Sequence, residues 1–239
     1  MDRADRPVAL FAALEAEAHA LVRRLATSTV PSPHLSIWQG LVEGTPVVLA
    51  ITGVGKVAAA LTTQFVCDVF PPRCAITFGL AGGADGDRQP GQLIIASGAL
   101  QHDVDARPLT DAKGTIPSLG KAVFPADSTL SAKLRRATES IVGNPQMVRS
   151  GMVLTGDQIV TSREVRDGLL RDFPQGVCFD METAAIAQVA FHNGIPWAAL
   201  RMTSDAADET FNLDEVIRFG INTAADLFDQ IVRAFLKTV

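Results

Sequence analysis

Carboxylates that follow apolar runs are the side chains of this chain best placed to do chemistry. Glu17, Glu182 and Asp205 each stand shortly after a strand-like run. Ligands of α/β folds bind beyond the carboxyl ends of strands, so polar residues at these positions are the ones to weigh. Asp180 and Glu182 also flank Met181 in an otherwise apolar stretch, where two carboxylates are costly unless they are hydrogen-bonded or functional. The pattern favours a binding or catalytic role for Glu182.

Two glycine-rich runs and the pair Gly156-Asp157 also lie where a strand is expected to end. The runs at residues 53–56 (GVGK) and 79–83 (GLAGG) could serve a ligand or only form tight turns, and neither matches a dinucleotide-binding or P-loop motif. Gly156 and Asp157 also follow an expected strand. Taken alone, these glycines are a weak indication of a site.

Two of the carboxylates also have an ordinary structural interpretation. An isolated glutamate such as Glu17 is most often a solvated residue near a helix N-terminus. Asp205 could be a helix N-cap, with Asp208 as a rival cap. Both interpretations stay open from the residues alone.

Other catalytic classes have no matching pattern in the sequence. The four histidines are scattered without metal-ligand spacing, and the three cysteines form no CxxC pair. No GxSxG elbow and no Ser-His-Asp order is present. The sequence therefore disfavours a metalloenzyme or a serine hydrolase, and no metal site is expected.

The elements that must position these residues alternate between strands and helices. Apolar runs rich in β-branched residues predict strands, and stretches of helical periodicity predict helices. Strands are expected at residues 8–13, 34–40, 46–52, 74–78, 92–97, 148–155, 177–180 and 197–202, and helices at 15–25, 56–69, 128–141, 162–170, 182–192 and 213–236. Residues 101–127 carry little periodicity and many turn formers, which indicates a long functional loop. This order predicts an α/β fold with a mixed, mostly parallel sheet, in one domain over residues 1–239.

Composition excludes several classes of protein. Hydrophobic residues make up 47% of the 239 residues, which is enough for a substantial core. The net charge is −5 and the basic residues form no cluster, so no nucleic acid partner is expected. The sequence has neither the apolar run of a signal peptide nor that of a membrane span. An odd number of cysteines in apolar contexts fits a reducing cytoplasm.

Seven motifs, taken in order, carry a resemblance to a known family. They are AALEAEAHAL at 12–21, TGVGKVAAAL at 52–61, FGLAGG at 78–83, QHDVD at 101–105, TGDQIV at 155–160, FDMETAAIAQVA at 179–190 and LRMTSDAAD at 200–208. The set resembles the 5′-methylthioadenosine/S-adenosylhomocysteine nucleosidases, within the nucleoside phosphorylase-like superfamily, over nearly the whole chain. The resemblance implies a three-layer α/β/α sandwich and a cytoplasmic homodimer. It also implies hydrolysis of the N-glycosidic bond of an adenine nucleoside, in methionine salvage and nucleoside catabolism, without a metal or organic cofactor.

The resemblance further implies roles for single residues. Glu17 matches the carboxylate that binds and deprotonates the attacking water, near Arg201. Asp205, supported by Ser204, matches the acid that protonates N7 of the leaving adenine, so this carboxyl must hold a proton at the working pH. Glu182 matches the residue that hydrogen-bonds the ribose hydroxyls, and a carboxylate there would stabilise the cationic sugar of the transition state. The remaining matches are substrate-binding positions: Leu80, Ala81 and Gly82 in the glycine-rich run, Ile159 and Val160 beside the base, and Met181 against the sugar.

Two residues depart from the family pattern and leave the exact nucleoside open. Leu80 stands where many members have a small hydroxyl residue, and Ile159 stands where the family usually has an aromatic that stacks on adenine. One alternative is a nucleosidase for a futalosine-type nucleoside or another 5′-substituted adenosyl compound. A second is a phosphorylase, which would need a phosphate-binding arginine where this chain has Thr77. A third, a nucleoside-binding protein without activity, is disfavoured because all three carboxylates are present.

The resemblance also predicts where a partner subunit would act. A homodimer is expected in which part of residues 101–127 reaches the partner's active site. Length and irregularity of this segment support the expectation, as do its apolar residues, namely Leu109, Ile116, Pro117, Leu119 and Phe124.

Overall fold

Strands and helices alternate along the chain as the periodicity predicts. The computed structural model describes residues 6–25, 29–30, 34–84 and 90–239. Its strands are β1 (Val8–Ala12), β2 (Ser36–Val42), β3 (Thr45–Ile51), β4 (Cys74–Gly83), β5 (Leu93–Gln101), β6 (Phe124–Pro125), β7 (Val148–Thr155), β8 (Gly176–Asp180) and β9 (Trp197–Asp205). Its helices are α1 (Glu15–Leu25), α2 (Lys56–Val69), α3 (Ser128–Val142), the 3₁₀ turn η2 (Pro145–Met147), α4 (Arg163–Asp172), α5 (Thr183–His192), α6 (Leu213–Phe219), the π turn η3 (Gly220–Ala224) and α7 (Ala225–Leu236).

The sheet is mixed, and part of it closes into a ring. β2, β3, β1 and β4 follow one another as an open part, in which β1 is parallel to both β3 and β4. From β4 the ring continues through β9, β5, β7 and β8, and β8 returns to β4 in antiparallel pairing. The expected α/β class with a mixed sheet is confirmed. A three-layer sandwich does not describe this closed part, because β4 pairs with β8 as well as with β1 and β9.

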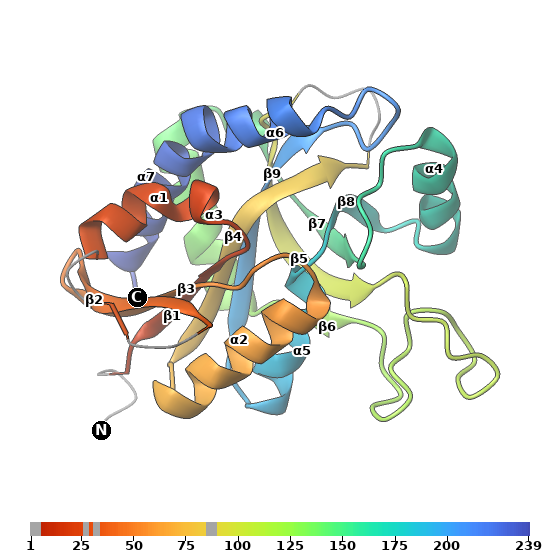
Figure 1. Cartoon of the computed structure of the whole chain (residues 1–239), viewed down its shortest axis with the longest axis horizontal. Coiled ribbons are helices and arrows are strands. Elements are labelled where there is room, and N and C mark those ends of the chain that lie inside the picture. Colours follow the sequence, from red (N-terminus) through yellow and green to blue (C-terminus); the bar gives the residue numbers. More distant parts are fainter. Residues whose placement is uncertain (1–5, 26–28, 31–33, 85–89) are drawn as a thin grey trace.

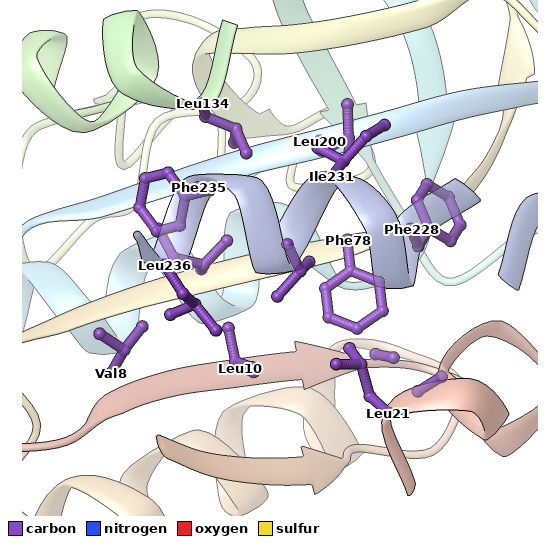
Figure 2. Close-up of a cluster of buried hydrophobic side chains, with 14 of the residues drawn as sticks. Val8, Leu10, Leu21, Phe78, Leu134, Leu200, Phe228, Ile231, Phe235 and Leu236 are labelled. Carbon is purple, nitrogen blue, oxygen red and sulfur yellow. The ribbon is translucent and has the colours of Figure 1, made fainter. Parts of the chain in front are cut away.

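Hydrophobic clusters cover both faces of the sheet, because successive strand residues point to opposite sides. Val8 and Leu10 of β1 lie in the cluster under α1, α3 and α7, where Phe78 meets Phe228 with ring centroids 5.5 Å apart (Figure 2). Ala9 of β1 lies in the cluster on the other face, with residues of α2 and α5. Figure 1 shows these two helices on the side of the sheet opposite α1 and α7. Each buried phenylalanine contributes on the order of 1.5–3 kcal/mol relative to an exposed one. These two clusters fix the strands whose ends form the site.

Two strands run further than the sequence predicts, and both extensions matter for the site. β4, expected to end at residue 78, continues through the GLAGG run, and β9, expected to end at residue 202, continues to Asp205. Gly82 and Gly83 pair with β8 and thereby close the ring. Glycine is required at one point of this strand, because a β-carbon on Gly79 would lie 2.7 Å from Oε1 of Glu17. The glycines therefore serve a close approach of side chains to the strand.

The closing helix and the long loop also differ in detail from expectation. The single helix expected at 213–236 is interrupted by the π turn Gly220–Ala224, which separates α6 from α7. Residues 101–127 are largely irregular, as expected, and end in the short strand β6. In Figure 1 this yellow-green segment extends away from the sheet as loops. Among the residues described, no helix is long and apolar enough to cross a membrane.

Candidate active site

One cavity of about 210 Å³ lies at the carboxyl ends of β1, β4, β7, β8 and β9, under α6. Its lining is mostly apolar, with three carboxylates of interest. Of the site residues predicted from the sequence, those that line it are Glu17, Leu80, Ala81, Gly82, Ile159, Val160, Met181, Glu182, Ser204 and Asp205. Arg201 does not line it. Residues as far apart in the sequence as Glu17 and Asp205 therefore converge, as their positions after strands predict.

Glu17 is a buried carboxylate held by backbone amides. Its side chain is only 4% exposed, so it is not a solvated helix residue. Oε2 accepts hydrogen bonds from the amides of Ala13 (3.1 Å) and Leu14 (3.0 Å), and Oε1 accepts one from Leu80 (2.7 Å). Burial raises the pKa of Glu17, although these amides and the charge of Arg201 act in the opposite direction. The arrangement gives a fixed carboxylate that is a stronger base than a solvated one.

Glu182 is the second buried carboxylate, at the residue before α5. Its Oε1 accepts a hydrogen bond of 2.8 Å from the amide of Gly55. Gly55 has φ of 98°, a left-handed conformation that favours glycine, so the GVGK turn presents this amide to the cavity. Burial, together with the neighbouring charge of Asp180, raises the pKa of Glu182 to about 8.

Arg201 lies behind the cavity in a buried polar network. Its guanidinium donates to Asp180 (2.8 Å), to Thr183 (2.7 Å) and to the hydroxyl of Thr77 (3.0 Å). Thr155 donates to the other oxygen of Asp180 at 2.6 Å. The charge of Arg201 is thereby paired, as a buried guanidinium requires. Its influence on the cavity is electrostatic, through the pKa of Glu17 and Glu182.

Asp205 ends β9 in a local turn at the cavity wall. Its Oδ2 accepts from the hydroxyl of Ser204 (2.7 Å), and its Oδ1 accepts from the amide of Ala207 (2.8 Å). The following helix, α6, is capped by Asn212, which accepts from the amides of Asp214 and Glu215. Neither Asp205 nor Asp208 is therefore the N-cap that remained possible from the sequence.

The comparisons with known proteins agree with this geometry. A family model described as the phosphorylase superfamily matches residues 7–237. The chain belongs to this superfamily. The 5′-methylthioadenosine/S-adenosylhomocysteine nucleosidases of Desulfotalea psychrophila and Staphylococcus saprophyticus are 33% and 32% identical to it, over 87% and 86% of this chain and 87% and 88% of theirs. The resemblance inferred from the seven motifs is confirmed.

Solved structures of the same kind of enzyme have the same fold. The nucleosidase of Neisseria meningitidis in complex with methylthio-immucillin-A has a TM-score of 0.89 and 31% identity, and covers 98% of this chain and 100% of its own. The nucleosidase of Colwellia psychrerythraea in complex with adenine has a TM-score of 0.87 and 28% identity, over 98% of this chain and 95% of its own.

The cavity is also lined by residues that the sequence did not identify as site residues. They come from five segments: Ala13 and Leu14 after β1, Val54 in the GVGK turn, Gln158 after β7, Phe179 and Asp180 at the end of β8, and Phe211, Leu213 and Val216 at α6. Val216 lies on the apolar stripe of α6, and that stripe was the only signal that could have found it. Ile159 is 54% exposed at the cavity wall, whereas Val160 is buried. In the described part of the chain no cluster of His, Cys, Asp and Glu could hold a metal ion.

Proposed function

We propose that this chain hydrolyses the N-glycosidic bond of adenine nucleosides with a 5′-thio substituent, namely 5′-methylthioadenosine and S-adenosylhomocysteine. Adenine and a 5-thioribose product would be released. The observation that carries the proposal is that Glu17, Glu182 and Asp205 line one cavity in a chain whose relatives carry the name of this enzyme.

In this proposal Asp205 is the general acid. Adenine is a poor leaving group as an anion, so a proton must reach N7 as the bond breaks. The hydroxyl of Ser204 holds Oδ2 of Asp205, and the amide of Ala207 holds Oδ1. These two bonds fix the direction of the carboxyl at the cavity wall, which supports a role in directed proton transfer.

Glu17 would bind the attacking water and take its proton. Its raised pKa makes it a stronger base than a solvated glutamate, and three amides fix the carboxylate in place. Arg201 would act from behind the cavity, where its charge keeps Glu17 from becoming too weak an acid. The water would thereby be activated without a metal ion.

Glu182 and Met181 would hold the sugar. Cleavage proceeds through a cationic, oxocarbenium-like sugar, which a nearby carboxylate stabilises. Glu182 would accept hydrogen bonds from the ribose hydroxyls, and Met181 would pack on the ring. The base would lie against Ile159 and the main chain of Val160, with Leu80, Ala81 and Gly82 completing the wall.

Thr77 supports hydrolysis over phosphorolysis. A phosphorylase would need an arginine at this position to bind phosphate. Here Thr77 is buried and accepts a hydrogen bond from Arg201, which already serves Asp180. The site therefore offers water activation by Glu17 in place of a phosphate cradle.

Adenine release tests the proposal directly. The protein is incubated with methylthioadenosine, adenosylhomocysteine, inosine and aminodeoxyfutalosine, each with and without phosphate. We expect phosphate-independent release of adenine from the first two. Phosphate dependence would establish a phosphorylase, preference for aminodeoxyfutalosine would establish the other nucleosidase, and binding without release of base would establish a binding protein.

Several expectations about the whole protein remain part of the proposal. We regard residues 1–239 as one domain, a variant of the α/β/α sandwich whose sheet is partly closed. A cytoplasmic location is supported by three buried cysteine thiols. These features accompany the catalytic proposal and do not carry it.

We propose a homodimer, but the apolar residues that support it are mostly not those of the segment 101–127 that the sequence indicated. Leu109 is 84% exposed, but Phe124 is buried, and Ile116 and Leu119 pack partly on the chain's own core. Exposed apolar residues lie instead on and before α2, namely Val54, Val57 and Leu61. A homodimer that covers this face and Leu109 would bury them. A monomeric mass at micromolar concentration with full activity would contradict it.

A further inference from the structure

Asp157 belongs to a polar pair that the sequence singles out, yet the proposed reaction gives it no role. Its Oδ1 accepts a hydrogen bond of 2.7 Å from the amide of Lys56, the first residue of α2. The preceding amide, of Gly55, is bound by Glu182. Gly55 is the N-cap residue of α2 and has no side chain that could bind the first amides of the helix. Two carboxylates from distant segments therefore satisfy the N-terminus of α2, where the helix dipole favours negative charge.

A third segment closes this connection. The ammonium group of Lys56 lies 2.6 Å from Oδ1 of Asp103, and the amide of Asp157 donates to Oδ2 of Asp103 at 2.9 Å. Each of the three side chains thus joins two segments of the chain. Burial would raise the pKa of Asp103, but the hydrogen bonds from Lys56 and Asp157 outweigh it and lower that pKa.

The same segments are in close contact beside the ion pair. A β-carbon on Gly156 would lie 2.3 Å from Nε2 of the buried His102, and one on Gly55 would lie 3.1 Å from Oδ1 of Asp157. The side chains of Lys56 and Asp103 are only 17% and 26% exposed. Water therefore screens this pair less than it screens a surface ion pair.

We propose that Lys56, Asp103 and Asp157 are positioning residues for the ligand-binding loop at 158–160 and for the amide that Gly55 donates to Glu182. The inference rests on the proposed function, since that function gives Ile159, Val160 and Glu182 their substrate contacts. Gln158, Ile159 and Val160 line the cavity directly after Asp157. The Lys56 amide is adjacent to the Gly55 amide, so a shift at Asp157 is transmitted to the base side and the sugar side together.

Four variants test this arrangement: Lys56→Met, Lys56→Arg, Asp103→Asn and the double variant Lys56→Met/Asp103→Asn. We expect KM for methylthioadenosine to rise about 10-fold in Lys56→Met and Asp103→Asn, as for the loss of one charge-assisted hydrogen bond. The value of kcat should fall less than KM rises. The double variant should be no worse than either single one, and Lys56→Arg should restore most of the affinity.

Hydrogen exchange provides a readout that does not need turnover. Amides of residues 156–162 should exchange faster in the free Lys56→Met and Asp103→Asn proteins than in the wild type, while those of α3 and α7 keep their rates. The matched control is the ion pair of Lys237 and Glu43, which lies 3.2 Å apart away from the cavity. Lys237→Met and Glu43→Gln should change KM by about twofold or less.

The outcomes separate the inference from the proposed function. No adenine release by the wild type would overturn the proposed function, while faster exchange at 156–162 in the variants would still support positioning of this loop. An unchanged KM together with unchanged exchange would overturn the inference. A lower Tm with an unchanged KM would also overturn it, because it would show a purely structural ion pair. If Lys56→Met fails to fold, Asp103→Asn decides, since it keeps the shape of the side chain.

Discussion

The two halves of the cavity hold their carboxylates in opposite ways. Glu17 and Glu182 are buried, and each accepts a hydrogen bond from an amide of a distant segment, that of Leu80 and that of Gly55. Asp205 is partly exposed, and its partners among the described residues are Ser204 and Ala207 of its own turn. In the first half burial raises the pKa of both carboxyls, so their ionised forms are costly, whereas in the second a local turn orients an acid at little cost to folding.

The largest expected effect is the loss of turnover in Asp205→Asn. Asparagine can still accept the hydrogen bond of the Ala207 amide but cannot transfer a proton. The value of kcat should fall by a factor on the order of 10² to 10⁴, with little change in substrate affinity. The Tm should stay close to that of the wild type, since the turn remains. Adenine release beside a thermal melt is the measurement, and near-normal turnover would remove the acid role from Asp205.

The buried half should respond in stability as well as in activity. Because the pKa of Glu182 is raised to about 8, its folded form holds a proton that the unfolded chain releases near pH 4.5. The contribution of this group to stability is complete below that lower value and is lost as the pH rises through about 8. Glu182→Gln should therefore raise Tm relative to the wild type more at pH 8.5 than at pH 4.5, while turnover falls.

Thermal melts at the two pH values check this prediction. An advantage of 1 kcal/mol corresponds to about 2–4 °C in a chain of this size. Glu15→Gln, on the exposed start of α1, is the matched control and should show no such difference. An equal change of Tm at both pH values would mean that the ionised form of Glu182 does not destabilise the folded protein.

A smaller effect is expected at the base side of the Asp205 half. Ile159→Phe places an aromatic face at a half-exposed position of the cavity wall, where it has room to stack on adenine. Stacking is worth about 0.5–1.5 kcal/mol beyond the area that it buries. KM for methylthioadenosine should fall by about 2- to 10-fold. Val165→Phe, on α4 outside the cavity, is the control, and a higher KM in Ile159→Phe would mean that Ile159 fits another substrate.

The smallest effect concerns the wall under α6 that the two halves share. A β-carbon on Gly220 would lie 3.3 Å from Cδ1 of Leu80, so Leu80 occupies space that a small residue in its place would leave open. Gly220→Ala should gain about 0.5–1 kcal/mol of helix stability in a Leu80→Ala background and less in the wild type. Denaturant unfolding of the four proteins measures this coupling. Equal effects in both backgrounds would show that Leu80 does not press on this turn.

The sequence by itself determined the order of elements and the candidates for the site. Periodicity and turn residues depend on neighbours along the chain, so the bounds of α1, α2 and β7 agree with expectation. The position after a strand selected Glu17, Glu182 and Asp205 for the same kind of reason, because ligands of α/β folds bind beyond the carboxyl ends of strands. Membership of the superfamily was also predictable from the sequence, because the seven motifs occur in the expected order.

Only the tertiary structure decided how those residues are held. The closure of the sheet depends on β4 meeting β8, and no local pattern marks Gly82 and Gly83 as the point of contact. Three features arise from contacts between distant segments. They are the burial of Glu17, the position of Arg201 behind the cavity, and the hydrogen bond from the Lys56 amide to Asp157. Local propensity and residue spacing do not predict such contacts. The free energy of these contacts comes from desolvation and hydrogen bonding, which arise only once the strands have paired.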